Sequence, residues 1–291
     1  MPSLLNRSQQ MIATTTARAS TQPARSRAIP RPRSPAVVFD KSIPRYWFAG
    51  NALGTHIANG VNMLFPAGER FFVRSVRHYL DRISDPVLRE QIRGFAGQEG
   101  RHAREHELAT HLLEEQGFDV KTFLSFYEWV AFRLIEKVSP AELRLASTAA
   151  CEHFTAIMAE NALRVRLLDH ADPTMRALLL WHSAEEIEHR AVAFDVLQQI
   201  NPSYALRVAG LAMATLTLSG FWAIATASLI AQDRSIDWRQ AAEEWRKVRE
   251  ARKAEPVFSR GIREYLRRDF HPSQSQADEL AREYLASAGL A

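Results

Sequence analysis

The stretch Trp181-His182-Ser183-Ala184-Glu185-Glu186-Ile187-Glu188-His189 carries the strongest structural signal in this chain. It has the composition of a helix and contains a Glu-x-x-His pair, Glu186 with His189. A second pair of the same kind, Glu99 with His102, lies upstream. Two Glu-x-x-His pairs on separate helices are typical of carboxylate-rich metal sites in helical bundles.

Two single glutamates complete the pattern. Glu69 and Glu152 each precede one of the pairs, on separate predicted helices. One glutamate from each of two helices, together with a Glu-x-x-His from each of two others, is the ligand set of a dinuclear site in a four-helix bundle. The sequence therefore predicts an all-α fold: a ferritin-like four-helix bundle with a crossover helix and additional C-terminal helices.

Helix geometry allows these side chains to converge. Successive helical residues are rotated by about 100°, so Glu99 and His102 lie about 60° apart on one face. That face of a bundle helix is normally apolar. Burying ionisable groups there is costly unless a cation or partners compensate. The downstream helix places four such groups in one sector: His182, Glu185, Glu186 and His189.

The ligand chemistry favours two divalent metal ions. Carboxylate and imidazole donors without thiolate suit iron best, with manganese or zinc as alternatives, and disfavour copper(I). The single cysteine, Cys151, excludes an internal disulfide and a cysteine-based zinc cluster. In this assignment the metal ligands are Glu69, Glu99, His102, Glu152, Glu186 and His189.

Several alternatives remain open for the carboxylates. Glu185 can take the place of Glu186, and Glu160 can take the place of Glu152. A carboxylate that binds no metal is a candidate proton acceptor, and Glu185 or Glu105 could serve. We assign Glu185 as the catalytic candidate.

The remaining histidines have alternative roles. His106 lies on the same arc as His102, and His182 on the arc of His189, so each is an extra ligand or an outer hydrogen-bond partner. We include His106 with Glu185 among the catalytic candidates. His153 is rotated away from Glu152 and is expected in the outer shell, and spacing gives no support for His271.

The charge distribution argues against nucleic acid as a partner. The chain has a net charge of +4, but residues 1–39 contain six arginines and no acidic residue. Without that segment the rest has 31 basic and 33 acidic residues (37 − 6 against 33), a net charge of −2. We expect 1–39 to be a disordered tail, although an Arg- and Ser-rich start is also typical of a transit peptide.

The remaining segments divide into helices and connections. We expect an irregular aromatic strap over 43–60, a helical metal-binding domain over 40–275 and a C-terminal helix over 276–291. The expected helices cover 66–83, 86–116, 121–137, 140–170, 173–200, 208–231 and 236–253, with two short helices over 257–288.

Residues 208–231 contain no charged residue. This segment is long enough to cross a bilayer, at roughly 36 Å of helix. A helix packed on the bundle or in a homodimer interface fits the same composition. We expect a cytoplasmic protein, with membrane association through 208–231 as the alternative.

Five segments resemble a bacterial family described as predicted metal-dependent hydrolases. Three are Phe65-Pro66-Ala67-Gly68-Glu69-Arg70, Gly97-Gln98-Glu99-Gly100-Arg101-His102 and Trp181 to His189; the others are Cys151-Glu152-His153 and Asp269-Phe270-His271-Pro272. Gly100 departs from the helix-favouring residue expected there. The resemblance covers roughly 40–275 and implies a metal-dependent hydrolase acting on a small molecule. The ligand pattern looks equally like that of di-iron oxidases and oxygenases, whose substrate here would be hydrophobic.

Overall fold

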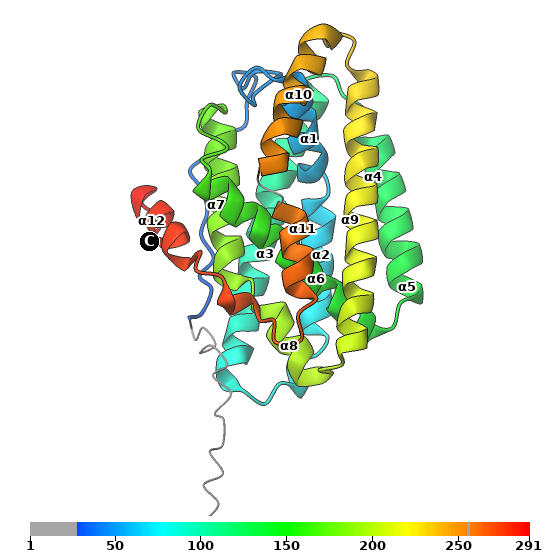
Figure 1. Cartoon of the computed structure of the whole chain (residues 1–291), viewed down its shortest axis with the longest axis vertical. Helices are drawn as coiled ribbons and strands as arrows, with labels where there is room; N and C mark the ends of the chain where they lie inside the picture. The colour runs from blue at the N-terminus through cyan, green and yellow to red at the C-terminus, as the bar shows by residue number, and fades with distance from the viewer. Residues whose placement is uncertain (1–27, 255–256) are drawn as a thin grey trace, which may run out of the picture.

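The computed structural model describes residues 28–254 and 257–291 (Figure 1). Within these residues the regular structure is helical, and the one β-type pairing is an isolated bridge between Phe48 and Ala171. The predicted all-α class is confirmed. The elements are α1 (Ala52–Asn62), α2 (Phe65–Arg77), η1 (Leu80–Arg82), α3 (Pro86–Glu115), α4 (Lys121–Glu128), η2 (Trp129–Ile135), α5 (Glu136–Val138), α6 (Ala141–Arg164), α7 (Pro173–His189), α8 (Val192–Ile200), α9 (Tyr204–Gln232), α10 (Trp238–Ala254), α11 (Val257–Tyr265), η3 (Pro272–Gln274) and α12 (Asp278–Ser287).

Two of the central helices begin where the sequence predicts. The Asp85 side chain accepts a hydrogen bond from the Val87 amide, and Pro86 occupies the first turn of α3. The Asp172 carboxylate accepts from the amides of the first turn of α7 in the same way. An aspartate cap followed by proline satisfies the free amide groups of a first turn. These caps fix the start of the two helices that carry the Glu-x-x-His pairs.

Helices α2, α3, α6 and α7 surround the centre of the molecule, with apolar clusters above and below the ionisable residues. The expected helix over 173–200 is interrupted, because α7 ends at His189 and α8 starts at Val192. The buried Arg190 guanidinium donates to the Asp278 carboxylate and the Pro272 carbonyl at this break. The C-terminal segment is thereby tied to the base of α7.

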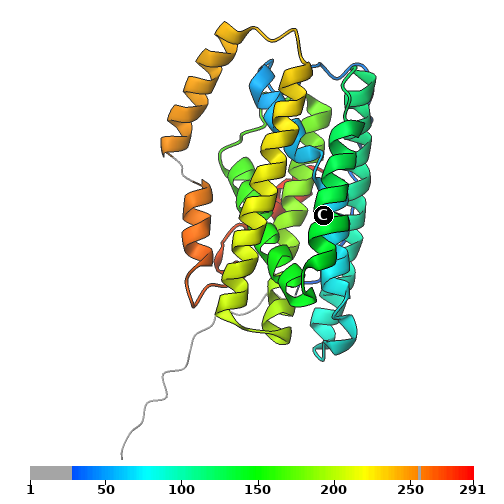
Figure 2. The ribbon, with the colours of Figure 1, turned by 90° about the vertical axis from the view of Figure 1, so that its right-hand side faces the viewer.

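The long apolar helix α9 packs on one side against α6 and α1 (Figure 2). Gly210 allows this approach, since a Cβ there would overlap the backbone of Ala146. By length and composition α9 could cross a membrane, and 28% of its most apolar 18-residue window is buried. The crossover arm, formed by α4, η2 and α5, lies beside α9. Its middle part, η2, is a π-helix rather than the expected α-helix.

Two expectations about the first part of the chain need correction. The strap expected over 43–60 is helical from Ala52, where the Asn51 side chain caps α1. The tail expected to be disordered over 1–39 is an extended segment over 28–39, and residues 1–27 lie outside the described part. Pro30 and Pro32 lie directly on α3, where the glycines at 94 and 97 leave room for them. Apolar proline contacts on a glycine face explain why this polar segment is ordered.

Alanine at Gly94 should displace this extended segment. A Cβ there would overlap the Pro30 carbonyl, whereas a Cβ at Gly100 in the same helix meets nothing. Glycine to alanine in an open helical position stabilises by roughly 0.5–1 kcal/mol. We expect Gly100→Ala to raise the melting temperature, and Gly94→Ala to speed trypsin cleavage after Arg33 severalfold. Equal cleavage rates in both variants would contradict the packing role of Gly94.

Candidate metal centre

The structure brings all six predicted ligands into one buried cluster between α2, α3, α6 and α7. Each is no more than 4% exposed. Their donor atoms form overlapping groups in which every ligand atom lies within 4.8 Å of the others. The groups are Glu69 with His102 and His182, Glu99 with Glu152 and His189, and Glu99 with His102 and Glu186. His182, an open case in the sequence, therefore joins the cluster.

A chain of hydrogen bonds fixes the protonation of His182. The Asn62 amide donates to Thr110 Oγ1 and the His106 carbonyl, so its Oδ1 faces His106 Nδ1 at 2.6 Å. An oxygen can only accept, so His106 Nδ1 carries the proton and His106 Nε2 accepts from His182 Nδ1 at 2.5 Å. The inner nitrogen of a neutral His182 is then a lone pair. That lone pair lies 2.9 Å from Glu186 Oε1 and 3.6 Å from Glu69 Oε1.

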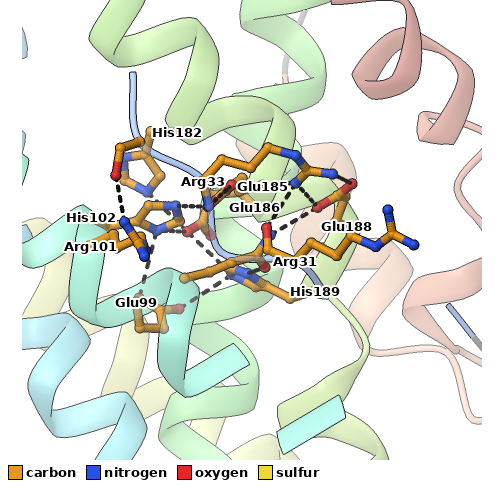
Figure 3. Close-up of polar contacts among 12 residues, drawn as sticks. Arg31, Arg33, Glu99, Arg101, His102, His182, Glu185, Glu186, Glu188 and His189 are labelled. Carbon is orange, nitrogen blue, oxygen red and sulfur yellow. Dashed lines mark hydrogen bonds and ion pairs between the residues drawn. The ribbon is translucent and has the colours of Figure 1, made fainter. Parts of the chain in front are cut away.

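His102 is oriented from the opposite side. Its Nε2 lies 3.0 Å from Glu185 Oε2, so Nε2–H donates outward and Nδ1 faces Glu99 and Glu186. Glu185 is itself held by Arg33, whose backbone N–H and Nη1 donate to Oε1 at 3.1 and 3.3 Å. Figure 3 shows Arg33 beside Glu185 on the outer side of the cluster.

His189 has an equivalent outer partner. Gln98 Nε2 donates to the Glu188 carboxylate and the Arg31 carbonyl, which turns Gln98 Oε1 toward His189 Nδ1 at 2.9 Å. His189 Nε2 therefore faces inward. It lies 3.3 Å from oxygens of each of three carboxylates: Glu99, Glu152 and Glu186.

The inner face of the cluster is rich in acceptors and poor in donors. In the described part of the chain, both oxygens of Glu69, Glu99 and Glu152 are buried without a hydrogen-bond partner. The inner nitrogens of His102 and His189 share this condition. Buried polar atoms are normally paired. A set of oxygen and imidazole acceptors aimed at common points fits divalent cations.

The pKa shifts have the same origin. Burial, followed by repulsion from the other carboxylates, raises the pKa of Glu69 well above its ordinary value. Burial opposes the charging of His102, but the hydrogen bond to Glu185 and the nearby carboxylates of Glu186 and Glu99 outweigh it and raise the pKa of His102 to about 9. Burial and the neighbouring imidazolium of His102 lower the pKa of His182 to about 4. The carboxylates thus draw positive charge into the cluster.

Other candidates lie outside the cluster. Glu160 pairs with Arg164 and accepts from Ser275, so it does not replace Glu152. His153 contacts the Gly261 carbonyl of α11 rather than the cluster. Glu105 is half-buried and belongs to none of the ligand groups.

The sequence interpretation missed the outer partners. These are Asn62, Gln98, Glu188 and the extended segment with Arg31 and Arg33. Only the glycine spacing of α3 hinted that a segment packs against it.

The chain belongs to the family described as predicted metal-dependent hydrolase, because the model of that family matches residues 31–276. The resemblance noted in the sequence is confirmed. No curated protein and no solved structure gave a significant match. The family match begins at Arg31 and so includes the residues that contact Gln98 and Glu185.

Chelated protein should lose stability as the pH rises from 6.5 to about 9. The pKa of His102 is raised from 6.5 to about 9 in the folded state, so its protonation stabilises the fold. This contribution is fully present below pH 6.5 and is lost as the pH rises through about 9. The raised pKa values of Glu69 and Glu152 act in the same direction. The lowered pKa of His182 adds no opposing change above 6.5.

The measurement is thermal unfolding by circular dichroism across this range, with chelator and with added divalent metal. We expect a loss on the order of a few kcal/mol in chelator and a smaller loss with metal, because cations then replace the protons. A chelated protein whose stability stays constant from pH 6.5 to 9 would contradict the charge distribution described here.

Proposed function

We propose that the cluster is a dinuclear divalent-metal centre and that the protein is a metal-dependent hydrolase. The observation that carries this proposal is the set of inward-facing lone pairs. His182 Nε2, fixed as an acceptor through His106 and Asn62, lies 2.9 Å from a Glu186 oxygen, which is also an acceptor. A cation between such groups removes the conflict.

The three ligand groups suggest two metal positions. Glu69, His102 and His182 would hold one ion, and Glu99, Glu152 and His189 would hold the other. Glu186 reaches histidines of both groups and would bridge them with Glu99. Four carboxylates balance two divalent charges. Such a centre would be of the ferritin-like type, and a ligand set of carboxylates and imidazoles favours iron, with manganese or zinc as alternatives.

Divalent ions held in this way supply Lewis-acid activation of water and of a carbonyl or phosphoryl group. The protein's own groups orient the ligands. Glu185 accepts from His102 and pairs with Arg33, and His106 accepts from His182, so both hold an imidazole in one tautomer. We therefore propose Glu185 and His106 as positioning residues rather than as the catalytic groups expected from the sequence.

An oxygen-activating oxidase or oxygenase is the second candidate. The observation in its favour is an apolar pocket that borders the cluster at Glu69. Four glutamates around two ions suit a metal that changes oxidation state, and aromatic rings pack against the imidazoles. Phe65 lies 4.7 Å from the ring centroids of both His106 and His182.

Removing one inner ligand should abolish metal binding while the helices remain. We expect His102→Ala and Glu186→Ala to lose nearly all bound metal at unchanged circular dichroism. Glu185→Gln keeps the shape but weakens the orientation of His102, and loss of such an outer partner typically costs 10–100-fold in metal affinity. The matched control is Glu107→Gln on the exposed face of α3, which should bind metal normally. Normal metal content in both alanine variants would refute the site.

Elemental analysis of the purified protein, followed by anaerobic reduction and exposure to oxygen, separates the two functions. We expect about two metal ions per chain if both groups are filled. Iron with an oxygen-dependent absorbance change would favour the oxidase or oxygenase. Redox-silent metal, together with release of an acid or phosphate from ester substrates, would support the hydrolase. Protein that binds no metal after reconstitution would refute both.

A further inference from the structure

An elongated pocket lies between α2, the crossover arm, α6 and α9. Its cavity volume is about 90 Å³, and its mouth opens to solvent. Its walls are largely apolar and aromatic. Apolar side chains in its lining include Phe71, Phe72, Phe132, Met213, Leu218 and Phe221.

One stripe of α6 gives the pocket its direction. Arg144, Ser147, Cys151 and Thr155 line it at helical spacing. From Arg144 to Thr155 the helix rises about 16 Å, at 1.5 Å per residue. Ser147 and Thr155 are neutral hydroxyls and Cys151 is a buried free thiol, so this wall carries no charged side chain along its middle. A narrow apolar space of this length suits a hydrocarbon chain better than a compact polar metabolite.

The two ends of the pocket differ in charge. At one end lies Arg144, which is half-buried and takes part in no side-chain hydrogen bond or ion pair among the described residues. Its neighbours there are already occupied: Glu136 pairs with Arg74, and Ser139 donates to a backbone carbonyl. An arginine at the end of a pocket whose guanidinium has no side-chain partner is suited to bind a planar carboxylate.

Farther along, Glu69 belongs to both the pocket and the metal cluster. It lines the pocket wall, and both of its oxygens are buried without a hydrogen-bond partner. Arg144 and Glu152 are eight positions apart on α6, about 12 Å along the axis. A ligand whose head group reaches Arg144 would therefore carry its chain past the cluster.

We propose that this pocket binds a long-chain carboxylate, with its head group at Arg144 and its hydrocarbon chain running along α6 to Glu69. That the bound molecule is the substrate rests on the oxidase or oxygenase named under the proposed function, because a hydrocarbon chain offers no bond to hydrolyse; that it binds does not. The carbon atoms presented to the metal centre lie well along the chain from the carboxylate. The crossover arm and α9 also expose apolar side chains, including Trp129 and Leu216, which suits a ligand that partitions from lipid.

Calorimetric titration of dodecanoate into the full chain tests the head group. We expect Arg144→Gln to weaken dodecanoate binding about tenfold or more, the scale of one charge-assisted hydrogen bond. Dodecanol, the uncharged probe of equal length, should bind more weakly than dodecanoate and respond little to this substitution. Arg133→Gln, an exposed arginine of η2 outside the pocket lining, is the matched control and should change neither affinity.

Filling the pocket tests the chain. A Cβ at Gly68 meets only the Tyr127 hydroxyl, at 3.5 Å, so the Gly68→Leu side chain would extend into the pocket. Thr217→Phe fills it from the opposite wall in case the first variant folds poorly. Both should abolish dodecanoate binding, whereas Gly220→Leu, at a glycine with open surroundings, should leave it intact.

Absence of dodecanoate binding to the unaltered protein would overturn the proposal. So would binding that Arg144→Gln and both filling variants leave unchanged, or dodecanol binding as tight as dodecanoate. Each titration is run with chelator and with metal, beside the metal content of the same sample. Dodecanoate binding to protein that takes up no metal even when metal is added would support the pocket and refute the proposed function. Metal uptake without dodecanoate binding would refute the pocket proposal and leave the metal centre supported.

Discussion

The burial of carboxylates at the centre of the bundle is the constraint on which the rest of the structure depends. Glu69, Glu99, Glu152 and Glu186 come from four different helices and are almost entirely withdrawn from solvent. Carboxylates in such a place repel one another and lose their hydration. Neighbouring imidazoles compensate in part, which explains why the pKa of Glu186 is lowered well below its ordinary value despite burial. The carboxylate oxygens of Glu69, Glu99 and Glu152 that have no hydrogen-bond partner are suited to bind cations.

This constraint extends outward to the segments that surround the bundle. A neutral imidazole presents a lone pair on its inner nitrogen when its outer nitrogen carries the proton and donates it to an acceptor. His102, His182 and His189 each have such an outer acceptor. The acceptors are Glu185, Gln98 Oε1 and the His106 ring, and each is held by another group. Arg33 and the Arg31 carbonyl hold two of them. The extended segment thus acts as the outermost layer of the centre, which agrees with a family match that starts at Arg31.

The sequence predicted what depends on local spacing and missed what depends on distant contacts. Glu99 with His102, and Glu186 with His189, share a face through helical rotation alone, so their convergence was predictable. Arg33 meets Glu185 across 152 positions, and no local pattern encodes that contact. The composition of residues 1–39, which include Arg33, favoured disorder. The sequence also did not predict the break of the helix after His189. The partners of Arg190 at this break lie in the distant C-terminal segment, so no local pattern encodes them.

The two halves of the cluster are not equivalent, and their difference bears on the chemistry. Of the four carboxylates, Glu69 is the one that also lines the pocket. Glu152 lies beside His189, whose ring contacts Gln98 and the Phe95 ring. A molecule in the pocket would therefore meet the half formed by Glu69 and His182 first. Phe65 packs against His182 and shields its ring. The enclosed half would serve mainly to hold charge, and the half at Glu69 would be the one open to exchange of ligands.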